Sequence, residues 1–255
     1  MLPENQNPSD LTADTIYKGA LTILQPRSGY RFAFDALLLA DFTRVKPGQL
    51  AVDLGSGVGV VALTLAQRMA RGRVLAVEIQ PRLAECARLN VRANRLEALI
   101  EVLELDWSKL TPERIGGPAA HVICNPPYRR LGTGRISPDQ EEAVARHELI
   151  GSLATAARAA VRLLAPGGLF TVIYPAARLA SLTVELRQSG LEPKRLRLVY
   201  SRPGDKARLA LVEARLDGGE ELEVCPPLYV YQKGDKYSTE MEAILSGEEV
   251  SGRRI

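Results

Sequence analysis

The chain has 255 residues, of which 46% are hydrophobic and 25% charged, and its formal net charge is +3. These proportions are typical of one soluble α/β domain with decorations. No apolar run approaches the roughly 20 residues that span a bilayer, and the polar N-terminus lacks a signal peptide's apolar stretch, so we expect a cytoplasmic protein that contacts no membrane.

The N-terminal part of the chain is predicted to be a lead-in followed by a buried helix. Residues 1–20 are expected to be loosely ordered, and we assign residues 1–30 to this lead-in. Residues 32–42, FAFDALLLADF, are densely apolar and free of Gly and Pro, which predicts a buried helix. The turn Lys46-Pro47-Gly48 then precedes the first predicted strand.

Short apolar strands then alternate with helices. We predict strands at residues 50–54, 73–78, 98–103, 121–124 and 169–174, and helices at 60–69, 81–94, 149–164 and 175–189. This alternation predicts a parallel sheet covered on both faces, and right-handed crossovers make it doubly wound. Residues 194–200 and 209–216, joined by the turn at 201–206, predict a terminal antiparallel hairpin. The expected fold is therefore an α/β doubly wound, mostly parallel, seven-stranded sheet.

The domain boundaries follow from this pattern. Residues 31–216 form the predicted catalytic domain, and residues 217–255 form a C-terminal extension packed on the same domain. Ser238 or Thr239 is a suitable N-cap for a short last helix in this extension.

Neither the cysteines nor the histidines form a metal-binding pattern. Cys86, Cys124 and Cys225 are far apart and contain no CxxC pair, so we expect buried small hydrophobic residues. His121 and His147 have no HxxxH or HExxH spacing. The sequence therefore predicts no metal.

A glycine-rich loop follows the first predicted strand of the sheet. The run Asp53-Leu54-Gly55-Ser56-Gly57-Val58-Gly59 lets the backbone approach a ligand closely. It does not fit the dinucleotide fingerprint GxGxxG, because the last glycine position falls on Val60. A carboxylate at Asp53 suits a cationic group, such as the amino group of a methionine moiety, better than a pyrophosphate.

Two more acids follow the next two predicted strands. Glu78 ends the second strand, where an acid can accept both hydrogen bonds from a ribose, and Ile79 could pack against a base. Asp106-Trp107 follows the third strand, where the Asp can accept from the exocyclic amino group of an adenine. Each acid alone is more typical of a surface or capping residue, but together they indicate a ligand site at the carboxyl ends of the strands.

These residues resemble the motifs of the Rossmann-like class I methyltransferases. The resemblance implies S-adenosylmethionine as cofactor. It assigns cofactor binding to the loop, the two acids and their neighbours: Asp53, Gly55, Ser56, Gly57, Gly59, Glu78, Ile79, Asp106, Trp107 and Asn125.

The fourth predicted strand leads into Asn125-Pro126-Pro127-Tyr128, the candidate catalytic residues. Two prolines fix the backbone, and the Asn amide and a proline carbonyl can then both accept from one amino group. Tyr128 offers a flat face on which a base can stack. The sequence NPPY is similar to the signature of methyltransferases that act on the amino groups of adenine, guanine or glutamine amides.

Three further stretches narrow the family: residues 29–40, residues 134–138 with 145–148, and residues 207–214 with 226–231 and 237–241. All three resemble the tRNA1(Val) (adenine-37 N6)-methyltransferase family. The resemblance implies a bacterial enzyme that methylates an adenine in a tRNA anticodon stem-loop. The alternatives are methylation of rRNA guanine or adenine, methylation of a protein glutamine amide, and a non-catalytic RNA-binding module.

Basic residues point to the RNA-binding surface. Arg129, Arg130 and Arg135 follow the catalytic loop and could hold the phosphates that flank a flipped-out base. Residues 178–215 contain nine Lys or Arg against four Asp or Glu, which suits either a phosphate backbone or a solvated surface. Arg146-His147-Glu148 could order a lid through an internal ion pair, and His147 as general base is a minor option.

Overall fold

The structure is a computed structural model that describes residues 10–28, 31–69, 71–127, 152–232 and 234–248. Among these residues, no helix combines the length and the apolarity needed to cross a bilayer.

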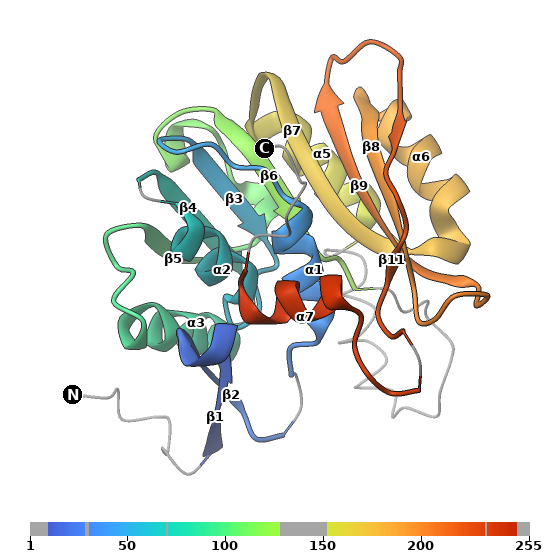
Figure 1. The fold of residues 1–255 in the computed structure, drawn as a ribbon. Coiled ribbons are helices and arrows are strands. Elements are labelled where there is room, and N and C mark those ends of the chain that lie inside the picture. The colour runs from blue at the N-terminus through green and yellow to red at the C-terminus, as the bar shows by residue number, and fades with distance from the viewer. Residues whose placement is uncertain (1–9, 29–30, 70, 128–151, 233, 249–255) are drawn as a thin grey trace, which may run out of the picture.

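A mixed sheet forms the centre of the molecule (Figure 1). Its order is β10-β8-β9-β7-β6-β3-β4-β5, and β11 also pairs with β8. The strands are β3 Leu50–Leu54, β4 Arg73–Glu78, β5 Ile100–Glu104, β6 Ala119–Cys124, β7 Leu164–Pro175, β8 Leu191–Tyr200, β9 Ala207–Leu216, β10 Glu223–Val224 and β11 Leu228–Tyr229. The predicted doubly wound, mostly parallel sheet with a terminal antiparallel hairpin is confirmed, since β3 to β7 are parallel and β9 is antiparallel to both of its neighbours. The predicted seven strands correspond to β3 to β9, and the short strands β10 and β11, which pair with β8, raise the number to nine among the described residues.

Helices cover both faces of this sheet. One face packs against α1 Phe34–Phe42, α2 Val60–Arg68, α3 Pro81–Ala93 and α7 Thr239–Ser246, and the other against α5 Leu153–Leu163 and α6 Leu179–Gln188. Successive residues of a strand point to opposite faces, so Ala51 packs in the first layer and Val52 in the second. Parallel strands buried on both faces explain why the strand sequences are continuously apolar.

The prediction of a loosely ordered lead-in was wrong for residues 10–20, and its first nine residues lie outside the described part of the chain. Strands β1 Leu11–Ile16 and β2 Leu21–Pro26 form an antiparallel hairpin. An isolated hairpin is marginally stable in water, but here Leu21 and Ile23 are fully buried in the layer that contains α2 and α3. Tertiary packing therefore orders a segment that is predominantly polar at its start.

Several boundaries differ from the predicted ones for local reasons. The strand predicted at 98–103 lies at Ile100–Glu104, and α6 begins at Leu179, after the short turn Ala176–Arg178. The strand predicted at 169–174 is longer, because β7 already begins at Leu164, with a shift in register against β6 between Ala119 and His121. The predicted helix at 149–164 is described only from its N-cap, Ser152, onward. Cys86 and Cys124 are buried as predicted, whereas Cys225 is only half-buried because it follows the short edge strand β10.

Arg197 ties the C-terminal segment to the sheet. Its side chain is 9% exposed on β8, where Nη2 donates to both carboxylate oxygens of Glu240 on α7 at 2.8 and 2.7 Å. Its Nε donates to the carbonyl of Pro226 at 3.0 Å. Ser238 is the N-cap of α7, as predicted, and its hydroxyl accepts from the Met241 N–H. One guanidinium thus joins β8, the segment before β11, and α7.

We expect Arg197→Ala to lower the free energy of unfolding by about 1–3 kcal/mol, because it leaves a carboxylate and a carbonyl without their charged donor. Arg215→Ala on the neighbouring strand is the control, since Arg215 is exposed and no acid in the described part of the chain pairs with it. Urea unfolding measures both variants. Equal stability of the two would mean that the Arg197 contacts contribute nothing.

Candidate cofactor and acceptor site

The ends of four neighbouring parallel strands place the predicted site residues in one row. Leu54 of β3 pairs with Cys124 of β6 on one side and with Val77 of β4 on the other. Asn125, Gly55 and Glu78 are the next residues along these strands, so Gly55 lies between the other two, about one strand spacing of 4.8 Å from each. Glu78 is opposite Glu104 of β5, two residues before Asp106. The carboxyl edge of the sheet therefore orders these residues as Asn125, Gly55, Glu78 and Asp106.

The glycine loop needs glycine for both conformation and space. Gly55 has φ +71°, and a Cβ there would lie 2.9 Å from Cζ3 of the Trp107 ring. Gly59 has φ +88° and is the N-cap of α2 without a side-chain cap. The first N–H groups of α2 therefore have no capping side chain from Gly59, which leaves backbone donors at the ligand edge.

Glu78 fixes the shape of this loop. Its side chain is buried, with 4% of the residue exposed. Oε2 accepts from the Gly57 N–H at 2.9 Å, and Oε1 accepts from the Gln80 N–H at 2.8 Å. Each carboxylate oxygen can accept more than one hydrogen bond, so these contacts leave capacity for ligand hydroxyl groups. Glu78 thus holds the loop as well as facing the site.

Asp53 is a buried acid that the described residues only partly satisfy. It is 2% exposed, and its Oδ2 has no hydrogen-bond partner among them. Desolvation, followed by the charge of Glu78, raises the pKa of Asp53 to about 7. A buried carboxylate of this kind is stabilised by a cation, so the site fits a ligand that carries a positive amino group.

The other predicted contacts surround the same edge. Ser56 Oγ and Trp107 Nε1 are buried polar atoms without a partner in the described part of the chain. Asp106 is half-buried and its Oδ1 accepts from the Ser108 N–H at 2.8 Å, so one oxygen caps the turn Trp107–Lys109. Ile79 is half-buried beside Glu78. A polar ligand bound at this edge would supply partners for these two buried atoms.

The acceptor loop begins where β6 ends. Asn125 is half-buried, Pro126 buried and Pro127 exposed. Tyr128, Arg129, Arg130 and Arg135 lie outside the described residues, as do Arg146, His147 and Glu148. The described part of the loop stands beside the glycine loop, which agrees with a methyl acceptor next to the cofactor.

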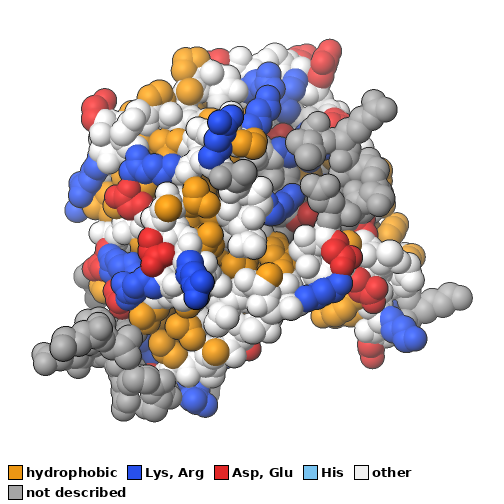
Figure 2. All heavy atoms as spheres, turned by 60° about the vertical axis from the view of Figure 1, so that its left-hand side comes forward, with side chains coloured by type: hydrophobic (Ala, Val, Ile, Leu, Met, Phe, Trp, Pro, Cys, Tyr) orange, Lys and Arg blue, Asp and Glu red, His pale blue; other side chains and the backbone are white. Residues whose placement is uncertain are grey.

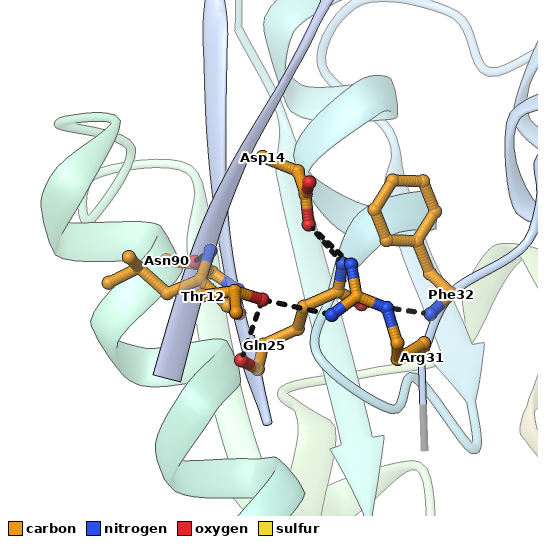
Figure 3. Close-up of polar contacts among 7 residues, drawn as sticks. Thr12, Asp14, Gln25, Arg31, Phe32 and Asn90 are labelled. Atoms are coloured by element: carbon orange, nitrogen blue, oxygen red, sulfur yellow. Dashed lines mark hydrogen bonds and ion pairs between the residues drawn. The ribbon is translucent and has the colours of Figure 1, made fainter. Parts of the chain in front are cut away.

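A hydrogen-bond network that the sequence did not suggest joins α3 to the glycine loop and to the β1–β2 hairpin, and Figure 3 shows the part of it between Asn90 and the hairpin. Asn90 on α3 is fully buried, and its Nδ2 donates to the carbonyls of Val58 and Leu24 at 2.9 and 2.8 Å. Its Oδ1 accepts from the Leu24 N–H at 2.6 Å. One turn later, Asn94 makes the matching pair of bonds to the N–H and carbonyl of Thr22. Asn90 thus binds both the glycine loop and the hairpin.

The hairpin in turn positions the segment that leads into α1. Buried Gln25 accepts from the Phe32 N–H at 3.1 Å and donates to Asp14. Figure 3 shows Arg31 directed toward Thr12 and Asp14, with 3.0 Å contacts to each. The residues before α1 are therefore held by the hairpin that α3 anchors.

The basic stretch at 178–215 divides into paired and unpaired residues. Arg187, Arg195, Arg197 and Arg202 form ion pairs with Glu192, Glu213, Glu240 and Asp235, respectively. Arg178, Lys206 and Arg208 have no ion-pair partner among the described residues. Arg178 follows the end of β7, Lys206 precedes β9, and Arg208 is the second residue of β9. Because β9 is antiparallel to β7, all three lie at the same edge as Asn125.

The face over α3 and β5 has a different distribution of charge from the carboxyl edge of the sheet. Figure 2 shows positive and negative side chains interspersed there. Arg88 pairs with Glu85 and Glu104, Arg92 with Glu85, and Arg73 with Glu101. Such a mixed surface has no stripe of one sign for a phosphate backbone.

No group of three potential metal ligands occurs among the described residues. His121 is buried in the sheet, where its Nε2 lies 2.6 Å from Thr171 Oγ1. Desolvation lowers the pKa of His121 to about 3, so this imidazole is neutral at physiological pH.

Comparisons with known proteins agree with this geometry. Residues 34–179 match the family described as methyltransferase small domain. The chain is 31% identical to the tRNA1(Val) (adenine(37)-N6)-methyltransferase of Porphyromonas gingivalis (strain ATCC 33277) over 72% of this chain and 74% of that protein. It is 29% identical to the protein of the same name from Bacteroides fragilis (strain YCH46) over 75% of this chain and 79% of that one. A crystal structure of a predicted O-methyltransferase from Agrobacterium tumefaciens superposes with a TM-score of 0.68, at 24% identity, over 87% of this chain and all of that one.

The fold and the site edge define a class I methyltransferase that uses S-adenosylmethionine, as the sequence predicted. Within that class, the chain belongs to the methyltransferase small domain family and, in it, to the tRNA1(Val) (adenine(37)-N6)-methyltransferases.

The pKa of Asp53 predicts that cofactor binding releases a proton. The folded-state pKa is raised above 3.8, so this group favours the folded protein at low pH, and that contribution is lost as pH rises through about 7. A cationic ligand prefers the ionised form, so affinity should rise by up to about tenfold per pH unit below pH 7.

Calorimetry of S-adenosylmethionine binding between pH 6 and 8, in two buffers of different ionisation enthalpy, measures the released proton. Asp53→Asn separates this proton from that of the ligand's own amino group. If the variant shows the same proton release as the wild type, Asp53 is not the linked group.

Asn90→Ala should both destabilise the fold and weaken cofactor binding. Three buried backbone groups lose their partner, which we expect to cost about 2–4 kcal/mol of unfolding free energy. The freed glycine loop is less preorganised, so cofactor affinity should fall by about tenfold.

Asn94→Ala is the matched control, because Asn94 holds the hairpin but makes no contact with the glycine loop in the described structure. It should lower stability while leaving cofactor affinity within about twofold of the wild type. An equal loss of affinity in both variants would show that the hairpin, rather than the Val58 contact, is responsible.

Proposed function

We propose that this protein methylates the exocyclic N6 amino group of an adenine in tRNA, and that this adenine is adenosine 37 of a valine tRNA. The observation that carries the proposal is the row of strand ends. Asp106 and Glu78 stand over β5 and β4, the glycine loop over β3, and Asn125 over the adjacent β6. This order matches an adenine, a ribose, a methionine and then a methyl acceptor.

Each acid has a separate role in cofactor binding. Asp106 accepts from the adenine amino group, and Glu78 accepts from the ribose hydroxyls while it keeps its bond to Gly57. Asp53, ionised by its ligand, pairs with the amino group of the methionine part. Bound S-adenosylmethionine supplies a methyl group on a positively charged sulfur.

The acceptor loop orients the target amino nitrogen. The amide oxygen of Asn125 and the carbonyl of Pro126 each accept one hydrogen of the amino group, which directs the nitrogen lone pair toward the cofactor. The nitrogen gains the methyl group and loses one proton to solvent. Alignment of this kind supplies most of the catalysis, because adenine needs no prior deprotonation by a strong base.

RNA binding is expected to use the cations at the same edge. Tyr128 stacks on the target base, and Arg129, Arg130 and Arg135 hold flanking phosphates in this proposal. Arg178, Lys206 and Arg208 add exposed or half-buried positive groups without an acidic partner in the described residues. The family to which the chain belongs favours tRNA over the alternatives, rRNA or a glutamine amide.

We expect Asn125→Ala to lower kcat for tRNA methylation by about 100-fold or more, since a preorganised group that acts on the reacting atom is lost. Cofactor affinity should stay within about threefold, because other residues supply most of the cofactor contacts. Single-turnover kinetics and cofactor titration measure the two effects. Near-wild-type kcat would exclude the loop from catalysis.

The substrate is tested with RNA and protein from a strain that lacks this chain. The purified enzyme and labelled S-adenosylmethionine are incubated with that material, and nucleosides from isolated valine tRNA are analysed by mass spectrometry. The expected product is N6-methyladenosine at position 37. Label in methylguanosine or methylglutamine instead would refute the substrate while leaving the reaction class intact.

A further inference from the structure

The C-terminal segment contributes an aromatic group to the edge that carries the acceptor loop. Strand β8 is parallel to β7 and β6, because β9 is antiparallel to both β7 and β8. Tyr200, at the end of β8, therefore lies at the same edge as Asn125. Figure 1 shows the chain that follows β11 at this edge, between β11 and α7.

Three side chains at this place form what we call the aromatic platform: Arg202, Tyr231 and Tyr237. The Tyr231 and Tyr237 rings are stacked, with centroids 5.2 Å apart and an interplanar angle of 12°. The Arg202 guanidinium carbon lies 5.0 Å from the centroid of the Tyr231 ring. Tyr237 is 42% exposed, so part of a flat aromatic ring faces solvent.

The platform is mounted rigidly. The N–H groups of Val230 and Tyr231 donate to the carbonyls of Tyr200 and Ser201 at 2.9 Å each, which continues the pairing beyond β11. The loop closes where the Gln232 N–H donates to the Lys236 carbonyl, and Tyr231 pairs with Tyr237. Arg202 Nη2 lies 2.7 Å from Asp235 Oδ1, and Arg202 Nε donates to the Gly234 carbonyl.

The surrounding charge favours a nucleic acid as the occupant. Lys206, Arg208 and Lys236 are exposed nearby, and none has an acidic partner among the described residues. Asp205 is an exposed acid in the same turn, and Asp235 is paired with Arg202. Flat aromatic rings beside unpaired cations bind unpaired bases and their phosphates.

The distance across the sheet excludes the target base itself. From β6 to β8 there are three strand spacings, and the segment after β11 adds a fourth, which gives roughly 19 Å. A base held at Asn125 cannot reach the platform, so the platform takes a different nucleotide.

We propose that the aromatic platform stacks an unpaired nucleotide of the same RNA, away from the methylated base, and so selects a folded loop over a short single strand. This inference rests on the proposed function, since it assigns a second contact to that substrate. It gives the C-terminal extension a role in recognition: the extension supplies Tyr231 and Tyr237, and the β8–β9 turn supplies Arg202.

The test uses the full-length enzyme with S-adenosylhomocysteine and a valine-tRNA anticodon stem-loop that carries 2-aminopurine at one loop position at a time. Stacking quenches 2-aminopurine fluorescence. We expect quenching at a nucleotide other than the target with the wild type and Tyr237→Phe, and its loss with Tyr237→Ala and Tyr237→Leu. The RNA Kd should rise about tenfold in the last two, the effect of losing one stacked base.

Cofactor affinity should be unchanged in all three variants, because Tyr237 lies beyond β11 and the glycine loop follows β3. Thermal stability should be unchanged in Tyr237→Phe and fall slightly and equally in Tyr237→Ala and Tyr237→Leu, which lose the stacked ring on Tyr231. If wild-type enzyme methylates the RNA and Tyr237→Ala binds it equally well with the same quenching, the platform is refuted while the proposed function stands. A dimer that dissociates in Tyr237→Ala at unchanged RNA affinity would also refute it, by assigning the rings to a contact between copies. Wild-type enzyme that neither binds nor methylates the RNA would overturn both.

Discussion

The buried carboxylate of Glu78 is the contact on which the geometry of the site depends. By accepting from the Gly57 N–H it fixes the glycine loop, and by its charge it helps to raise the pKa of Asp53 to about 7. Two buried carboxylates so close to each other cannot both ionise readily without a cation. The same acid therefore shapes the loop and disfavours ionisation of its neighbour, and in the proposed function the positive amino group of the cofactor offsets this repulsion.

Much of the fold followed from the sequence because buried parallel strands leave a strong local signal. The apolar runs at β3 and β4 and the Pro81 start of α3 were located to the residue, and the hairpin of β8 and β9 was predicted from its turn. The β1–β2 hairpin was not, because its order comes from Asn90 and Asn94, which bind its backbone from a helix about 70 residues away. The residue pattern within either segment gives no sign of such a long-range contact.

Some features of the candidate site could likewise be predicted from the sequence, and others could not. Glycines and acids at strand ends could be predicted, since the fold fixes which loops meet at the carboxyl edge. The second role of Glu78 and the contact of Asn90 with Val58 could not, because they depend on how side chains meet in three dimensions. The sequence could not show which cations of the basic stretch at 178–215 are paired. In the structure, acids neutralise Arg187, Arg195, Arg197 and Arg202. Arg178, Lys206 and Arg208 lie at the carboxyl edge without an acidic partner among the described residues.

The C-terminal extension links these observations. Nη2 of Arg197 on β8 contacts both carboxylate oxygens of Glu240 on α7 in a largely buried ion pair. Just after β8 ends, the Arg202 guanidinium lies over the Tyr231 ring. The Arg197–Glu240 pair fixes the helix that follows the Tyr231–Tyr237 loop. The contact of Arg202 with Tyr231 can therefore hold the stacked, exposed Tyr237 ring in one orientation. A flexible ring would lose conformational entropy on stacking, whereas a ring already held by the fold loses little. In the proposed function the cofactor lies over β3 to β5 and the methyl acceptor over β6, so β8 and the extension are the part of this edge that we propose contacts the rest of the RNA.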